Sequence, residues 1–232
     1  MNKMLKAIIF DCDGIIADSE PHHLRAFQTT LEEEGISLTR EEYYHEYLAM
    51  DDKGFFTTIL SVYKRTVDNK ILKKLIIRKM ALYRILSGKD LYLYPGVVEF
   101  VRKAEGRYRL AIASGAFRGE IKAILDKGGM RAAFPVIVSA QDVRNGKPHP
   151  EAFLTALAKL NALPRQKQSI PPEACVVIED SLHGLEGVRL AGMRSLAVTN
   201  TYPKEVLRAK ADRVVKSLMD VDPKDLEDLC RK

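Results

Sequence analysis

Two aspartates near the start of the chain stand where a carboxylate could do chemistry. Asp11 and Asp13 directly follow the apolar run of residues 5–10, and Gly14 comes next. Such a run is typical of a buried strand, where a carboxylate is costly unless it is paired or binds a metal. In an extended chain Asp11 and Asp13 lie on one side and Cys12 on the other. One carboxylate could attack an electrophile while the other moves a proton beside a hard cation. If this motif is considered alone, the alternative is that it forms a plain surface turn.

A second pair of acids, Glu179 and Asp180, ends the apolar run of residues 176–178. Acids at two strand ends can converge on one Mg²⁺, which prefers oxygen ligands. The alternative is that Asp180 or Ser181 only caps the helix that follows.

Two further polar positions suit a phosphate group. Ser114 and Gly115 follow an apolar run and precede a helical segment, where a hydroxyl and free amides can bind an anion. Lys147 lies between a glycine and a proline, which would hold its ammonium group in place. An ordinary N-cap serine and a surface lysine are the alternatives. All these positions lie at or near the ends of predicted strands, and a parallel sheet brings such ends together.

Short apolar runs alternate with helical patterns along most of the chain, which predicts an α/β fold with a parallel sheet. The expected strands are Leu5–Phe10, Arg109–Ala113, Val136–Ser139, Cys175–Glu179, Ser195–Val198 and a short one at Arg213–Val215.

Residues 18–89 interrupt this alternation because they show only helical patterns. Ser19 is the expected N-cap of the first helix, and further helices are expected at 40–48, 53–64 and 70–86. An ordinary connection has about 2–6 residues, so we expect a helical domain at 18–89 inserted into a core of 1–17 and 90–232. The basic residues of the last helix are expected on a solvated face: Lys70, Lys73, Lys74, Arg78, Lys79 and Arg84.

Composition narrows the class of protein. Among the 232 residues, 37 Lys and Arg against 31 Asp and Glu give a net charge of +6, which could attract anionic metabolites. The basic residues are dispersed without interleaved aromatic residues, so we expect no nucleic-acid partner. Three widely spaced cysteines predict neither a disulfide framework nor a zinc site. No segment approaches the roughly 20 apolar residues of a membrane span, so a cytoplasmic protein is expected.

Taken together, these motifs resemble the haloacid dehalogenase superfamily: Asp11-x-Asp13-Gly14, Ser114, Lys147-Pro148 and Glu179-Asp180, in this order and with a helical insert after the first. Residues 16–23 and 146–150 look more narrowly like its β-phosphoglucomutase-like branch of phosphatases and mutases. The resemblance implies a Rossmann-like parallel-sheet core with an inserted α-helical cap domain.

The resemblance also implies roles for these residues. Asp11 would be the nucleophile that forms an aspartyl-phosphate, and Asp13 would protonate the leaving oxygen and then activate water. Mg²⁺ would be held by Asp11, the backbone carbonyl of Asp13, Asp180 and, directly or indirectly, Glu179. The phosphoryl oxygens would be bound by Ser114, the Gly115 amide and Lys147.

The resemblance assigns the insert to substrate recognition. His23 matches a position at the cap hinge that can contact the site, although a packed structural histidine is an equal alternative. Lys53 ends the segment 47–53, which aligns with the substrate-facing loop of the cap. It could bind a second anionic group or be solvated, and Arg118 is a candidate of the same kind.

The function implied is a Mg²⁺-dependent phosphatase for a small phosphorylated metabolite, such as a sugar phosphate, acting as a monomer. A phosphoglucomutase is the nearest alternative, but its cap loop carries Gly and a Ser-Arg pair where residues 49–53 read Ala-Met-Asp-Asp-Lys. Dehalogenases of the superfamily lack the acid that Asp13 supplies here. A non-catalytic binding module on the same fold is the alternative from another class.

Overall fold

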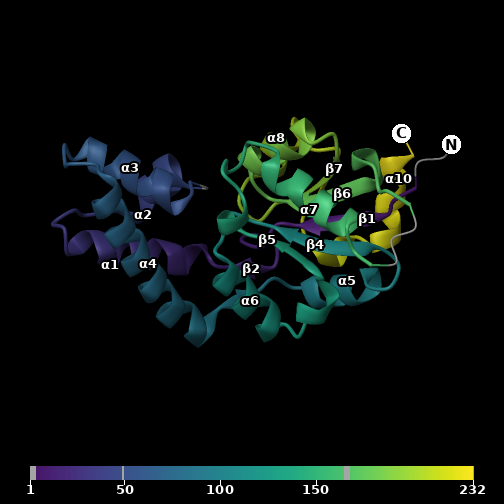
Figure 1. Cartoon of the computed structure of the whole chain (residues 1–232), viewed down its shortest axis with the longest axis horizontal. Helices are drawn as coiled ribbons and strands as arrows, with labels where there is room; N and C mark the ends of the chain where they lie inside the picture. Colours follow the sequence, from purple (N-terminus) through teal and green to yellow (C-terminus); the bar gives the residue numbers. More distant parts are fainter. Residues whose placement is uncertain (1–3, 49, 165–167, 232) are drawn as a thin grey trace. The chain divides into compact units, whose positions relative to one another are not determined.

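The computed structural model describes residues 4–48, 50–164 and 168–231 (Figure 1). The chain divides into two compact units, residues 1–18 with 93–232 and residues 19–92. We call them the core unit and the helical unit. The sequence-based boundaries lie at 17/18 and 89/90. A two-stranded sheet pairs β2 (Ala17–Asp18) with β3 (Tyr92–Leu93), the two stretches at which the units divide.

Six parallel strands form the sheet of the core unit, in the order β5-β4-β1-β6-β7-β8. They are β1 (Ala7–Phe10), β4 (Arg109–Ala113), β5 (Val136–Val138), β6 (Cys175–Glu179), β7 (Arg194–Val198) and β8 (Arg213–Val215). Each expected strand is confirmed, with ends that differ by at most two residues. The α/β fold class with a parallel sheet is therefore confirmed.

The register of the sheet aligns the ends of the strands that carry the predicted site. Phe10 of β1 lies opposite Ile112 of β4 and Ile178 of β6. The next residues along the three strands, Asp11, Ala113 and Glu179, therefore lie at the same level of the sheet.

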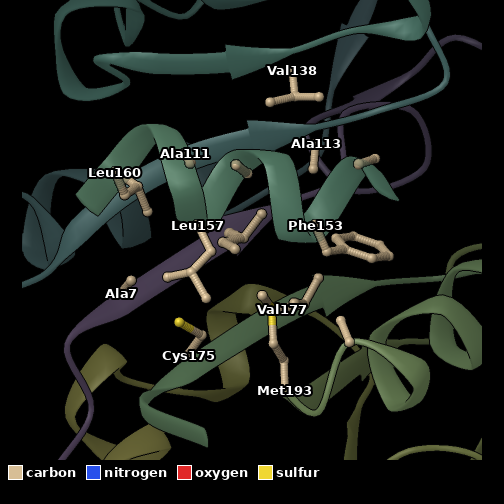
Figure 2. Close-up of a cluster of buried hydrophobic side chains, with 14 of the residues drawn as sticks. Ala7, Ala111, Ala113, Val138, Phe153, Leu157, Leu160, Cys175, Val177 and Met193 are labelled. Atoms are coloured by element: carbon tan, nitrogen blue, oxygen red, sulfur yellow. The ribbon is translucent and has the colours of Figure 1, made fainter. Parts of the chain in front are cut away.

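The two faces of β1 pack against different partners, as side-chain alternation along a strand requires. Ala7 and Ile9 join the apolar cluster beneath helix α7 (Glu151–Asn161), and Figure 2 shows the α7 side chains of this cluster against the strands. Phe10 faces the other way, with its ring 6.0 Å from that of Phe100 in α5 (Val97–Ala104). This two-sided burial explains why β1 reads as a continuous apolar run.

Further helices cover the sheet, and α7 packs on β4 and β5 while α8 packs on β6 and β7. The remaining helices of the core unit are α6 (Arg118–Lys127), α8 (Leu182–Leu190), α9 (Lys204–Arg208) and α10 (Glu227–Cys230), with short 3-10 turns η2 (Arg131–Ala133), η3 (Ala140–Asp142), η4 (Pro172–Ala174), η5 (Leu218–Asp220) and η6 (Pro223–Leu226). No helix of the described ranges combines the length and the apolar composition needed to cross a bilayer.

The helical unit consists of α1 (Glu20–Glu32), α2 (Arg40–Glu42), the π-helix η1 (Tyr43–Tyr47), α3 (Asp52–Val62) and α4 (Asn69–Asp90). The expected helix at 40–48 is divided, because the α-helical turn α2 continues as a π-helix. Ser19 occupies the N-cap position of α1, but its side chain makes no capping hydrogen bond.

The expectation that Lys79 is solvated is wrong. Leu72, Leu75, Lys79 and Tyr83 are the buried residues of α4, at spacings of three and four that place them along one face. The ammonium group of Lys79 lies 2.7 Å from a carboxylate oxygen of Asp52, so its charge is paired inside the helical unit.

Candidate functional site

The candidate site lies at the carboxyl edge of the sheet in the core unit. The backbone N–H of Asp11 donates to the carbonyl of Ile178 at 3.0 Å, so the pairing of β1 with β6 continues into the first acidic segment. The side chains of Asp11 and Glu179 are both buried there. Two predicted groups that are far apart in sequence are thus brought together.

Lys147 joins these two acids. Its Nζ lies 2.9 Å from Oδ1 of Asp11 and 2.5 Å from Oε1 of Glu179. The ring of Phe153 lies beneath the ammonium group, 5.3 Å from the nitrogen to the ring centroid. Lys147 is therefore not a solvated surface lysine.

Glu179 is fully buried and accepts several hydrogen bonds. Its Oε2 accepts from the backbone N–H of Asp180 at 2.9 Å and from the N–H and Oγ of Ser181 at 2.8 and 2.9 Å. A Cβ added at Gly184 would lie 1.8 Å from Oε1 of Glu179, so α8 approaches this carboxylate closely. Oε2 is thus occupied by donors from its own loop, and Oε1 by Lys147.

Ser181 is the residue that caps α8, because its Oγ accepts the N–H of Gly184 at 3.0 Å. The side chain of Asp180 is not used in this cap and lies buried in the site. The alternative that this segment is only a helix cap therefore holds for Ser181 and not for Asp180.

Two residues of the site were missed by the sequence analysis. The hydroxyl of Thr201 donates to Oδ2 of Asp180, and Nδ2 of Asn200 donates to the carbonyl of Gly14 at 2.6 Å. Both residues follow β7. The only signal for them in the sequence is that they come just after a predicted strand, whose end should lie at the same edge of the sheet. They also line an open depression of about 500 Å³ with Thr199 and residues 202–204 and 216.

The buried charges shift the pKa values of this cluster. Burial is the main cause that raises the pKa of Asp11 to about 7, opposed by Lys147 and reinforced by the charges of Glu179 and Asp13. Burial, followed by the charges of Glu179 and Asp11, also raises the pKa of Asp180 well above its usual value. Burial alone would lower the pKa of Lys147, but Asp11 and Glu179 raise it above its usual value.

This arrangement fits a hard divalent cation. Asp11, Glu179 and Asp180 each offer a carboxylate oxygen, and these atoms lie within 4.8 Å of one another. One ammonium group among three buried carboxylates leaves an excess of negative charge, which is costly without a further cation. The close approach of Gly14 adds to the fit, because a Cβ there would lie 1.9 Å from Oδ2 of Asp180.

Ser114 and Gly115 follow β4, next to the end of β1. Ser114 is buried, its backbone N–H donates to the carbonyl of Val138 at 3.1 Å, and its Oγ accepts the N–H of Ala116 at 3.1 Å. Gly115 is exposed. Asp13 is half-buried in the loop after β1, and its charge contributes to the raised pKa of Asp11.

The remaining candidate residues, His23, Lys53 and Arg118, lie in different units of the chain. His23 and Lys53 belong to the helical unit, where Nδ1 of His23 lies 2.7 Å from Nζ of Lys79 and Lys53 is exposed in the first turn of α3. Residue 49 of the segment 47–53 lies outside the described residues. Arg118 pairs with Asp142 in the core unit, so its guanidinium already has an anionic partner.

Comparisons with known proteins agree with this geometry. The family described as haloacid dehalogenase-like hydrolase matches residues 5–192. The chain is 28% identical over 197 residues to "Phosphorylated carbohydrates phosphatase" of Thermotoga maritima, covering 83% of this chain and 84% of that protein. It is also 28% identical over 206 residues to "Protein SUPPRESSOR OF QUENCHING 1, chloroplastic" of Arabidopsis thaliana, of which it spans only 19%.

Solved structures share the fold. CbbY from Rhodobacter sphaeroides in complex with phosphate is 28% identical with a TM-score of 0.81, covering 96% of each chain. β-Phosphoglucomutase from Clostridium difficile has a TM-score of 0.85 at 22% identity, covering 98% of this chain and 97% of that one, and shows likeness of fold alone. Since the family match spans most of the sequence, the chain belongs to the haloacid dehalogenase-like hydrolases.

Proposed function

We propose that this chain is a Mg²⁺-dependent phosphatase that hydrolyses a small phosphorylated sugar through an aspartyl-phosphate on Asp11. Membership of the family, together with the phosphatase names of its relatives, makes it a phosphoric monoester hydrolase. The proposal of an aspartyl-phosphate on Asp11 depends on one observation, the contact of Lys147 with Asp11 and Glu179. This contact supports an anion-binding ammonium group beside a buried nucleophile.

In the first step, a carboxylate oxygen of Asp11 attacks phosphorus, and the bond from phosphorus to the sugar oxygen breaks. Asp13 gives its proton to that oxygen, so the sugar leaves as a neutral alcohol. Ser114, the Gly115 amide and Lys147 bind the other phosphoryl oxygens, on which negative charge gathers as the bond breaks.

In the second step, Asp13 removes a proton from a water molecule whose oxygen attacks phosphorus. The bond to Asp11 breaks, and inorganic phosphate and free Asp11 result. One carboxyl group can serve both steps because the second step reverses the direction of its proton transfer.

Mg²⁺, when bound, would neutralise the repulsion between an anionic nucleophile and an anionic phosphate. Asp11, Asp180 and the backbone carbonyl of Asp13 are its proposed ligands. The hydrogen bonds that Glu179 accepts from Lys147, Asp180 and Ser181 support an indirect role for this residue, which holds the ligands and Lys147 in position.

In this proposal the helical unit is the cap that recognises the leaving group. Lys53 is its candidate cation for a second anionic group, because it is exposed. The contact of His23 with Lys79 supports a structural role for that histidine. Recognition of the sugar by the cap, a cytoplasmic location and a monomeric state remain predictions.

The test is turnover of p-nitrophenyl phosphate and a panel of sugar phosphates, with and without Mg²⁺. We expect turnover only with Mg²⁺, a loss of at least about a thousandfold in Asp11→Asn, and a phosphorylated Asp11 peptide in acid-quenched wild type by mass spectrometry. Asp126→Asn, an exposed carboxylate on α6, is the matched control and should keep full activity. Inertness of the wild type toward the whole panel would favour a binding module, and efficient isomerisation of glucose 1-phosphate would favour a mutase.

A further inference from the structure

Asp142 collects hydrogen bonds from three elements of the core unit. It ends the turn η3, and its Oδ2 accepts from the backbone N–H of Ser139 at 2.9 Å and from its Oγ at 2.6 Å. Nη2 of Arg118, the first residue of α6, lies 2.6 Å from Oδ1 and 2.5 Å from Oδ2. Nζ of Lys159 in α7 lies 3.0 Å from Oδ1. One carboxylate therefore joins the end of β5, the start of α6 and the last turn of α7.

The loop of residues 114–118 is held against the segment that Asp142 closes. The N–H of Ala140 donates to the carbonyl of Ala116 at 3.0 Å, and the N–H of Arg118 donates to Oε1 of Gln141 at 3.1 Å. This loop carries Ser114 and Gly115 at its beginning. Its position thus depends on the turn η3 at one side and on the Arg118–Asp142 pair at its end.

The loop of residues 143–147 begins directly after Asp142 and ends at Lys147. Its backbone is held by Glu151 of α7, which accepts the N–H groups of Arg144 at 2.9 Å and Asn145 at 3.0 Å. The Lys159–Asp142 pair ties the same helix to η3. The loop therefore starts at Asp142, and its residues 144 and 145 are held by the helix that Asp142 ties to η3.

Charge supports this arrangement. Partial burial opposes ionisation, but the hydrogen bonds from Ser139 and the charges of Lys159 and Arg118 hold the pKa of Asp142 well below its usual range. Asp142 is thus an anion at neutral pH, with two cations and two neutral donors around it. Such charge-assisted bonds are stronger than neutral ones and fix geometry.

We propose that Asp142 is a positioning residue that fixes the two phosphate-binding loops, residues 114–118 and 143–147, relative to each other. This inference rests on the proposed function, in which Ser114, Gly115 and Lys147 bind phosphoryl oxygens. The candidate metal ligands come instead from the ends of β1 and β6, whereas the hydrogen bonds of Asp142 within the described residues go to Ser139, Arg118 and Lys159. Loss of Asp142 should therefore weaken phosphate binding without weakening Mg²⁺ binding.

The experiment compares Asp142→Asn with the wild type, using inorganic phosphate as competitive inhibitor at saturating Mg²⁺ and calorimetric titration with Mg²⁺ alone. We expect the inhibition constant for phosphate and the KM for a phosphate ester to rise by about tenfold to a hundredfold, since misplacement of positioned groups by about 1 Å has effects of this size. The Kd for Mg²⁺ should stay within about twofold. Asp126→Asn, which removes a charge elsewhere on the core unit, should change neither value.

An unchanged inhibition constant for phosphate overturns the inference, and so does an equal weakening of phosphate and Mg²⁺ binding, which a loosened fold would produce. Should Asp142→Asn be recovered unfolded, Arg118→Gln and Lys159→Gln each remove one tie and are judged by the same two constants. A wild type that neither turns over phosphate esters nor binds phosphate overturns the proposed function together with this inference. If the wild type turns over phosphate esters and binds phosphate, and the variants have the same inhibition constant for phosphate, only this inference is overturned.

Discussion

The hydroxyl of Thr201 donates a hydrogen bond to Oδ2 of Asp180, across the boundary between β7 and β6. Its neighbour Asn200 binds the carbonyl of Gly14 in the loop after β1. The segment after β7 therefore contacts both acidic segments of the site. We therefore expect Thr201 to orient Asp180 as a candidate metal ligand, because groups that bond to such ligands fix their direction.

Thr201→Val should weaken Mg²⁺ binding by about tenfold, because the substitution keeps the shape of the side chain and removes its donor. Calorimetric titration with Mg²⁺ measures the change. Thr199→Val is the control, since Thr199 lines the same depression and, within the described part of the chain, its side chain makes no hydrogen bond to Asp11, Glu179 or Asp180. Equal Mg²⁺ affinity of Thr201→Val and the wild type would show that Asp180 is oriented without this hydroxyl.

Mg²⁺ itself should stabilise the folded protein. Binding to the folded state alone adds about 2.7 kcal/mol to the free energy of unfolding when the ion is a hundredfold above its Kd. We expect this increase in urea denaturation of the wild type and its loss in Asp180→Asn. A stabilisation that Asp180→Asn retains would place the ion at other residues.

Gly14→Ala should damage the metal site more than it damages the fold. Gly14 has a φ of +76°, and its added Cβ would lie 1.9 Å from Oδ2 of Asp180, so this carboxylate would have to move. We expect Mg²⁺ affinity to fall by at least about tenfold, measured by titration.

Gly35→Ala separates backbone strain from this clash. Gly35 has a similar φ of +70° but open space around its missing Cβ. It should lose about 1 kcal/mol of stability at unchanged Mg²⁺ affinity. If the two variants lost Mg²⁺ affinity alike, strain rather than the contact with Asp180 would be the cause.

Lys79→Met should destabilise the helical unit by about 3–5 kcal/mol, because it leaves Asp52 as a nearly buried carboxylate without its cation. Hydrogen exchange of residues in α3 and α4 measures the change. In the double variant Lys79→Met, Asp52→Asn the cost should be smaller than the sum of the single ones. Lys74→Met on the same helix is the control and should cost at most about 0.5 kcal/mol, since the Lys74–Glu34 pair is exposed.

The strands and the acids at their ends could be predicted from the sequence because both depend on local pattern. Runs of apolar residues mark β1, β4 and β6, and the rule that parallel strands end at one edge then brings Asp11, Ser114 and Glu179 together. The position of Lys147 follows the same rule, since its loop follows β5 with only the short turn η3 between them.

Other features of the site could not be predicted because they depend on contacts between distant segments of the chain. Thr201 and Asp180, which are joined by a hydrogen bond, are residue types that occur in any polar loop. Asp142 likewise has no sequence feature that distinguishes it from the other acidic residues. Lys79 was misassigned because its type outweighed its position on the apolar stripe of α4. A lysine at the spacing of buried residues is either solvated or paired with a buried anion. The sequence pattern does not tell these apart, and the structure shows that Asp52 is the anion here.

The stability conferred by Asp142 should depend on pH in a defined direction. Its pKa in the folded state lies below its ordinary value of 3.8, so ionised Asp142 contributes stability above that pH and loses it as the pH falls further. Asp142→Asn should therefore cost about 1–2 kcal/mol at pH 7, a figure reduced for partial exposure, and less below about pH 4. Urea denaturation of both proteins between pH 3 and 8 measures the difference. A difference that stays constant over this range would mean that the charge of Asp142 does not stabilise the fold.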